Sequence, residues 1–98
     1  MTERYTFQGF YIRPDMVESL ERYVEGGVPP GGFLQAVLCN DLAEACSRAD
    51  LENLRNIPAF AAYLHNRVPW GAWGDYKRFE AWCVQGGKKG RDRKEKAE

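Results

Sequence analysis

The chain has 98 residues and a formal net charge of zero, and 44% of its residues are hydrophobic. This length fits one domain with enough apolar residues to form a core without a structural metal ion or disulfide. No apolar run approaches the roughly 20 residues that span a bilayer, and the N-terminus lacks the apolar stretch of a signal peptide. We therefore expect a soluble cytoplasmic protein that has no membrane partner.

The charges are unevenly distributed along the chain. Residues 1–85 carry 8 Lys/Arg and 11 Asp/Glu, whereas residues 86–98 carry 6 Lys/Arg and 3 Asp/Glu. An acidic body argues against general nucleic-acid binding by the folded surface, while a basic tail adds nonspecific affinity for a polyanion. The three cysteines, Cys39, Cys46 and Cys83, include no CxxC pair, so we predict free thiols in a reducing compartment.

Residues 1–13 form an aromatic-rich segment before the first predicted helix. Tyr5 and Phe7 alternate with polar residues, which is a weak strand signal. No second strand candidate follows, so we predict an extended N-terminal arm that packs on the helices. The alternative is that the arm pairs with another chain, either a second copy in a homodimer or a different partner.

The first predicted helix covers residues 14–25. Pro14 suits the first helical turn, and Gly26-Gly27 supplies the left-handed residue that commonly ends a helix. Apolar side chains recur at helical spacing and predict one buried face. The other side of the helix carries acidic residues at Glu18, Glu21 and Glu25.

Residues 31–50 have apolar positions with a period near 3.6, which predicts helical structure. Asn40-Asp41 is a capping pair in the middle of this run. Two short helices, about 31–39 and 41–48, therefore fit the pattern as well as one kinked helix does. The positions assigned to the buried face are Phe33, Leu34, Val37, Leu38, Leu42, Ala45, Cys46 and Ala49.

The next helix is predicted over residues 51–66, with Asp50 as its N-cap. Leu51 and Leu54 begin its apolar face. Pro58 falls inside the pattern and is expected to kink the helix or to split it, because proline removes a backbone donor and clashes with the preceding turn.

A last helix is predicted over residues 76–85, with Asp75 as its cap, and the glycine pair at 86–87 ends it. Residues 86–98 have almost no apolar side chain, so we predict a disordered charged tail. The expected fold is all-α: a compact bundle of four to five short helices over residues 14–85, preceded by the extended arm of residues 1–13.

Few residues suggest catalysis. His65 lies in a predicted helix with no nucleophile beside it, and a dyad with Cys39 or Cys83 has no further support in the sequence. No zinc-ligand spacing or phosphate-binding loop occurs. We therefore predict a protein that is not an enzyme and that uses no cofactor or metal ion. Three acidic residues lie close together in the sequence: Asp41, Glu44 and Asp50. We interpret Asp41 and Asp50 as helix caps and Glu44 as a solvated side chain.

An aromatic row with three-residue spacing runs from Trp70 through Trp73, Tyr76 and Phe79 to Trp82. Such spacing drifts by about 60° per step on a helix with 3.6 residues per turn, so the five rings cannot share one buried face. We expect Phe79 and Trp82 in the core. Trp70, Trp73 and Tyr76 are candidate partner-binding residues, because Trp and Tyr are enriched at interface hot spots; the alternative is that the two tryptophans close over the helices.

The basic tail supports an alternative function. Its cations could bind DNA or RNA in a small nucleic-acid-associated regulator, with binding that weakens steeply as salt rises. Base stacking on the aromatic row, with Lys77 and Arg78 supplying charge, is a further alternative. The candidate nucleic-acid-binding residues of the tail are Lys88, Lys89, Arg91, Arg93 and Lys94.

Part of the sequence resembles a known family. The residues that carry the resemblance are Leu20, Tyr23-Val24, Gly26-Gly27, Pro30-Gly31, the run 33–38, Asn40-Asp41-Leu42, Glu44-Ala45, Arg48-Ala49-Asp50, Asn53, the run 63–66, Pro69 and Trp73-Gly74. In these positions the chain resembles short proteins of unknown function encoded by tailed phages and prophages. The N-terminal arm and the basic tail lie outside the resemblance.

The resemblance implies a context and no reaction, because the shared positions contain no catalytic motif. Small phage accessory proteins of this size include inhibitors of bacterial defence such as anti-CRISPR proteins, which as a rule occupy a surface of an effector complex. The expected function is therefore inhibition of a host effector protein or ribonucleoprotein complex by binding. A self-associating structural phage protein is a further alternative.

Overall fold

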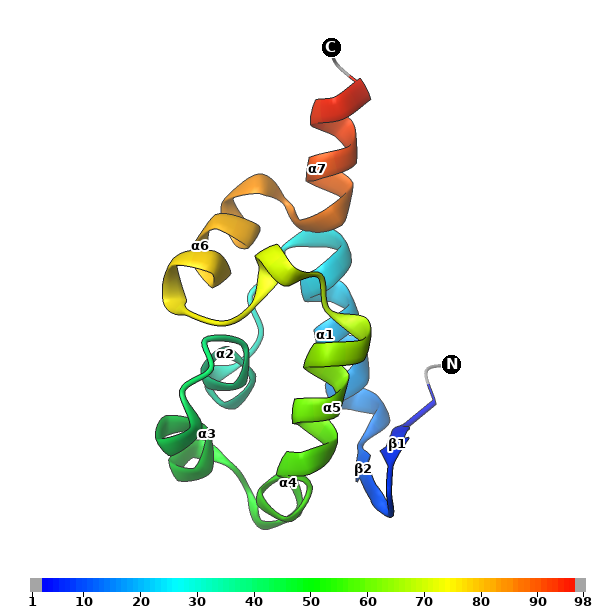
Figure 1. The fold of residues 1–98 in the computed structure, drawn as a ribbon, viewed down its shortest axis with the longest axis vertical. Helices are drawn as coiled ribbons and strands as arrows, with labels where there is room; N and C mark the ends of the chain where they lie inside the picture. The colour runs from blue at the N-terminus through cyan, green and yellow to red at the C-terminus, as the bar shows by residue number, and fades with distance from the viewer. Residues whose placement is uncertain (1–2, 97–98) are drawn as a thin grey trace.

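A computed structural model describes residues 3–96, with side chains described through residue 93. The fold is mostly helical, with one small antiparallel sheet (Figure 1). The elements, in chain order, are β1 (Tyr5–Phe7), β2 (Phe10–Ile12), α1 (Pro14–Gly26), α2 (Gly32–Leu38), α3 (Leu42–Arg48), α4 (Leu51–Arg55), α5 (Ile57–Arg67), the 3₁₀-helix η1 (Trp70–Ala72), α6 (Tyr76–Gln85) and α7 (Gly87–Lys96).

The N-terminal arm is a β-hairpin, which corrects the prediction of an all-α fold with a lone extended arm. Tyr5 pairs with Ile12 and Phe7 with Phe10. Gln8 and Gly9 both have positive φ, 48° and 87°, as the favoured two-residue hairpin turn requires. The strand signal at Tyr5 and Phe7 thus finds a partner strand within the same arm.

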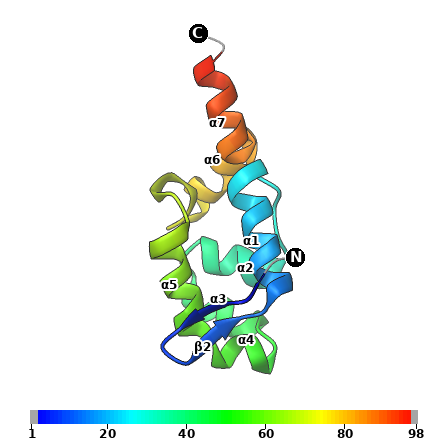
Figure 2. The same ribbon diagram turned by 90° about the vertical axis from the view of Figure 1, so that its right-hand side faces the viewer.

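The hairpin packs across α5 at the end of the molecule opposite α7 (Figure 2). The Tyr5 ring lies edge-on to the Tyr63 ring of α5, with a centroid distance of 5.1 Å. The Arg67 guanidinium lies over the Tyr5 ring, 5.4 Å from its centre. Ile12 is fully buried. The arm therefore belongs to the folded body and packs on the helices, as predicted.

The predicted helix boundaries between residues 14 and 85 are close to those in the structure. Residues 31–50 form two helices, α2 and α3, with the Asp41 side chain accepting a hydrogen bond from the Glu44 N–H. The 51–66 run splits into α4 and α5 at Asn56, which leaves Pro58 in the first turn of α5, where its missing N–H costs nothing. There are more helices than the four to five expected, because of this split and of α7.

The core forms between α1, α2, α5 and α6. Its largest fully buried side chains are Tyr23, Phe60, Ile12, Leu20 and Leu38. Several residues assigned to buried faces lie elsewhere: Cys46 is only half-buried, and Leu42 is 65% exposed. Leu51 and Leu54 are exposed as well. The reason is that α3 and α4 are too short to bury a complete apolar stripe against one neighbour.

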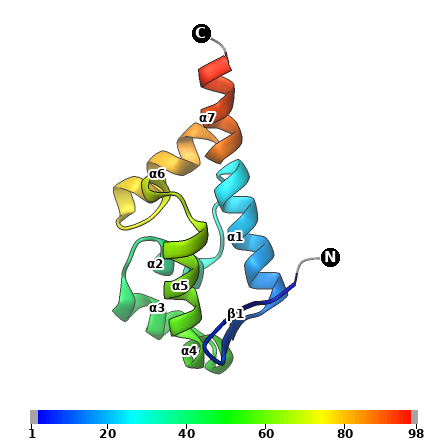
Figure 3. The same cartoon turned by 45° about the vertical axis from the view of Figure 1, so that its right-hand side comes forward.

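The ends of α1 and α7 meet through backbone contact (Figure 3). Gly27 and Gly87 have φ of 70° and 69°, a region that favours glycine. A Cβ on Gly27 would lie 2.7 Å from the Gly87 nitrogen, and a Cβ on Gly87 would lie 2.7 Å from the Gly26 nitrogen. No side chain fits between the two segments at these positions, so Gly27 and Gly87 are needed for this approach.

The first part of the predicted disordered tail is helical. α7 begins at Gly87 and packs against the C-terminal end of α1, while its later turns extend away from the body (Figure 1). The Arg91 guanidinium lies 5.8 Å from the centre of the Trp82 ring. The prediction therefore fails for residues 87–93, where backbone contact and this cation–π contact replace the missing apolar side chains. Residues 97–98 lie outside the described part of the chain.

Candidate binding surface

The turn that carries the exposed aromatic residues is anchored to the core on both sides. Ala72 is fully buried, and its carbonyl accepts a 2.6 Å hydrogen bond from the Tyr23 hydroxyl. The Gly74 N–H donates to the Leu38 carbonyl of α2 at 2.8 Å. Val68, just after α5, is also buried. The segment from residue 68 to residue 74 is thus held at three points, which orients the side chains between them.

Trp70 projects from this turn and is 77% exposed. Its ring stacks on Trp73 with a centroid distance of 6.2 Å and an interplanar angle of 20°. Trp73 is half-buried, and the His65 ring of α5 meets it edge-on at 5.2 Å. The three rings lie in a row, with half-buried Trp73 between exposed His65 and exposed Trp70.

Tyr76, the third predicted aromatic site residue, begins α6 and is 62% exposed. Its ring lies 6.3 Å from that of buried Phe79. It lines an open depression of about 430 Å³ together with Cys39, which follows α2, and Arg48 of α3. A hydrogen bond with Glu80 raises the pKa of the Tyr76 phenol. Tyr76 is available to a partner, and the structure gives no contact that joins it to the Trp70–Trp73 stack.

The predicted acidic face of α1 lies beside the predicted basic tail. Glu18, Glu21 and Glu25 are all exposed and line an open groove of about 350 Å³. Lys89 of α7 lines the same groove, and Glu18 forms a 3.8 Å ion pair with Arg22. The two charged sites proposed separately from the sequence are therefore one surface of mixed charge, which reduces its attraction for a polyanion and for a polycation alike.

The other basic residues of α7 differ in their surroundings. Lys88 and Arg93 are exposed, whereas Arg91 is half-buried over Trp82 and forms a 3.7 Å ion pair with Asp92. The side chain of Lys94 lies outside the described residues. Of the five predicted nucleic-acid-binding residues, Arg91 thus has a contact that stabilises the fold.

The residues considered for catalysis are dispersed. Cys39 and Cys83 are half-buried, and burial raises the pKa of both thiols, which disfavours the thiolate. His65 has its ring contact with Trp73, and no described contact joins it to either cysteine. Within residues 3–93 no three His, Cys, Asp or Glu side chains group so that they could hold a metal ion.

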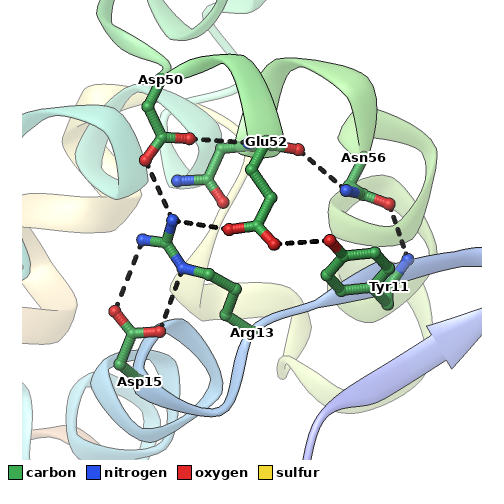
Figure 4. A network of polar contacts seen from close by, with 7 residues as sticks. Tyr11, Arg13, Asp15, Asp50, Glu52 and Asn56 are labelled. Carbon is green, nitrogen blue, oxygen red and sulfur yellow. Dashed lines mark hydrogen bonds and ion pairs between the residues drawn. The ribbon is translucent and has the colours of Figure 1, made fainter.

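A polar network that the sequence did not reveal joins the hairpin to α4 (Figure 4). Arg13 forms ion pairs with Asp15, Asp50 and Glu52 at 3.1, 3.0 and 2.9 Å. The Tyr11 hydroxyl donates to Glu52. The capping prediction for Asp50 is confirmed, because its side chain accepts from the Asn53 N–H. The ion pairs of Arg13 and the hydrogen bond of the Tyr11 hydroxyl all lie within the network, so we assign it a structural role.

Hydrogen bonds in this network lower the pKa values of two carboxylates. The Tyr11 hydroxyl, followed by Arg13, holds the pKa of Glu52 below its usual value. The Asn53 backbone N–H, followed by Arg13, does the same for the pKa of Asp50. Asn56 completes the link, since its side chain accepts from the Tyr11 N–H and donates to the Glu52 carbonyl, both at 2.8 Å.

No helix between residues 3 and 96 has the length and apolar character needed to cross a bilayer. Comparison with known proteins gives no relative: the chain matches no protein-family model, and neither a curated protein nor a solved structure is significantly similar to it.

Proposed function

We propose that this chain is a non-enzymatic phage accessory protein that inhibits a bacterial defence system, as anti-CRISPR proteins do. It would bind a host effector protein or ribonucleoprotein complex in the cytoplasm. Two things support the proposal. One is the resemblance of residues 20–74 to short phage proteins. The other is the exposed aromatic turn, which is a surface for binding.

The observation that carries the proposal is the exposure of Trp70 on an anchored turn. A tryptophan side chain that is 77% exposed leaves a large apolar ring in water, although burial would stabilise it. Because Ala72 and Gly74 are hydrogen-bonded to the core, the ring is presented with little backbone freedom to lose on binding. Trp and Tyr on such supports are the residues that dominate interface energies.

The alternative of a nucleic-acid regulator that acts through the tail has less support. Lys89 shares its groove with three glutamates, and Arg91 packs over Trp82. These placements leave fewer tail cations free to meet phosphates than the sequence suggests. We therefore assign partner binding first to Trp70, Trp73 and Tyr76, and second to the acidic row of Glu18, Glu21 and Glu25.

Phage plating tests the proposal. The chain is expressed in a panel of bacterial strains, each with one defence system that restricts a given phage. We expect the efficiency of plating to rise in one of these strains. Trp70→Ala is expected to remove most of this effect at equal protein level.

Val84→Ala is the matched control, since Val84 is an exposed hydrophobic residue of α6 that is 82% exposed. This variant is expected to protect the phage as well as the unmodified chain does. No rise in plating in any strain, with the protein shown to accumulate, would contradict the proposed inhibition of defence.

A further inference from the structure

We infer that the outer face of Trp70 is a stacking seat for an unpaired nucleobase, so that this surface recognises exposed nucleotides of a ribonucleoprotein. The identity of the complex rests on the proposed function, whereas the base seat rests on the geometry and charge of the turn. The ligand class is single-stranded RNA or DNA, contacted over a few nucleotides.

The shape of the site favours a planar ligand. One face of the Trp70 ring is turned to Trp73 at an interplanar angle of 20°, and the centroid distance of 6.2 Å means that the two rings overlap only in part. Because the side chain is 77% exposed, the opposite face of the ring is open to solvent. A flat aromatic ring that is already oriented by a stacked neighbour is the platform on which bases stack in single-strand-binding proteins.

The chain segment that carries the stack differs in charge from the rest of the body. Residues 65–80 carry three Lys/Arg, one His and two Asp/Glu, whereas residues 3–64 carry five Lys/Arg and nine Asp/Glu. The guanidinium of Arg78 lies against Gly74, the residue after Trp73. Asp75 caps α6 by accepting from the Arg78 N–H, and a hydrogen bond links Glu80 with the Tyr76 hydroxyl. The segment that carries the aromatic turn is thus less acidic than residues 3–64, and Arg78 is a cation beside the turn that could meet a phosphate.

The acidic remainder of the body limits the length of strand that can bind. A long polyanion that extended beyond the turn would meet the repulsion of residues 3–64, so we expect contacts to two or three phosphates. Counterion release then predicts a shallow salt dependence, with a slope of about −1.4 to −2.1 in log K against log salt for a single strand. A site that worked by charge alone would not discriminate between a base and an empty sugar.

The test uses the full chain and a labelled oligothymidylate of about ten nucleotides, a length within the range of known single-strand sites. Fluorescence anisotropy at low salt is expected to detect binding. Trp70→Ala is expected to weaken it by about 5- to 150-fold, the effect of losing one base–aromatic stack. Trp70→Phe retains a ring and is expected to lose less, while Val84→Ala is expected to bind as the unmodified chain does.

An abasic strand of the same length provides the second control, because it keeps the phosphates and lacks the rings. We expect it to bind at least several-fold more weakly than oligothymidylate. Equal binding of the two strands, or equal binding by Trp70→Ala and the unmodified chain, would overturn the inference. Loss of binding in a Lys88→Ala, Lys89→Ala variant, with Trp70→Ala unaffected, would place the contact on α7 and overturn it too.

The two proposals fail in different ways. No oligothymidylate binding, together with loss of phage protection in Trp70→Ala, would mean that the surface binds protein; the base seat would be wrong and the inhibitory function would stand. Binding that depends on Trp70, without phage protection in any strain, would support the base seat and contradict the proposed inhibition. Thermal unfolding of each variant is measured as a control, and we expect every variant to keep the fold.

Discussion

Trp82 and Trp70 lie twelve positions apart in the same aromatic row, yet their surroundings are opposite. Trp82 is 4% exposed, and its Nε1 donates to the carbonyls of Tyr23 and Val24 at 3.0 and 3.1 Å. These carbonyls belong to the last turn of α1, where backbone donors run out; the Tyr23 carbonyl also accepts from the Gly27 N–H at 2.8 Å. Trp70 is 77% exposed and touches the fold through Trp73. Trp82 thus holds α1 and α6 together, whereas Trp70 is available to a partner.

The largest effect on stability is expected for Trp82→Ala. This change removes a buried ring and leaves two carbonyls at the end of α1 without their side-chain donor. Truncation of a buried aromatic residue costs about 3–5 kcal/mol, which lowers the midpoint of thermal unfolding by about 15 °C or more in a domain of this size. Circular dichroism during heating measures this midpoint. A midpoint within a few degrees of the original would show that Trp82 does not hold α1 and α6 together.

The second largest loss of stability is expected where the backbones of Gly27 and Gly87 meet, beside Trp82. Gly87→Ala places a Cβ against the backbone of Gly26 and Gly27, in addition to the cost of positive φ for alanine. Gly9→Ala is the matched control, since Gly9 has φ of 87° and no atom within 4 Å of the added carbon. We expect Gly9→Ala to cost about 1–2 kcal/mol, the left-handed penalty, and Gly87→Ala to cost more. Chemical denaturation compares the two, and equal losses would mean that α7 does not require this close approach.

A smaller effect is expected at the hairpin, where the contacts are polar and exposed to water. The pKa values of Asp50 and Glu52 are lowered in the fold, so their ionised forms contribute stability above the ordinary values of 3.8 and 4.5. This contribution is lost as the pH falls through the lowered pKa values of the folded state. Arg13→Ala is expected to reduce stability at neutral pH and to flatten its decline in acid. An unchanged pH profile would show that the network in Figure 4 adds nothing measurable.

The smallest effect on stability is expected for Trp70→Ala. The side chain is mostly in water, so its removal is expected to change the free energy of unfolding by no more than about 0.5 kcal/mol, as at other surface positions. Denaturant unfolding measures this difference. A loss near that of Trp82→Ala would remove the contrast between the two tryptophans and make Trp70 part of the core.

The same contrast shows what could be predicted from the sequence. The boundaries near Pro14, Asp41, Asp50 and Asp75 were predicted because caps and prolines act within a few residues of their own position. The division of the aromatic row also followed from helical geometry, and Trp82 is buried as expected. These features depend on local sequence alone.

What could not be predicted depends on long-range contact. The hairpin turn at Gln8-Gly9 lacks the Asn-Gly or Asp-Gly signal, and strands of three residues leave almost no periodicity. α7 has few apolar side chains, and what holds it is backbone contact with Gly26 and Gly27 from the other end of the chain. The meeting of Lys89 with the α1 glutamates follows from that contact and was invisible for the same reason.

The most direct test of the account joins stability and function in one variant. Trp70→Ala is purified, its thermal midpoint is compared with that of the unmodified chain, and both are assayed for phage protection in the strain where the chain is active. We expect an unchanged midpoint and loss of most of the protection. Full protection by a variant that folds normally would show that Trp70 is not the functional surface.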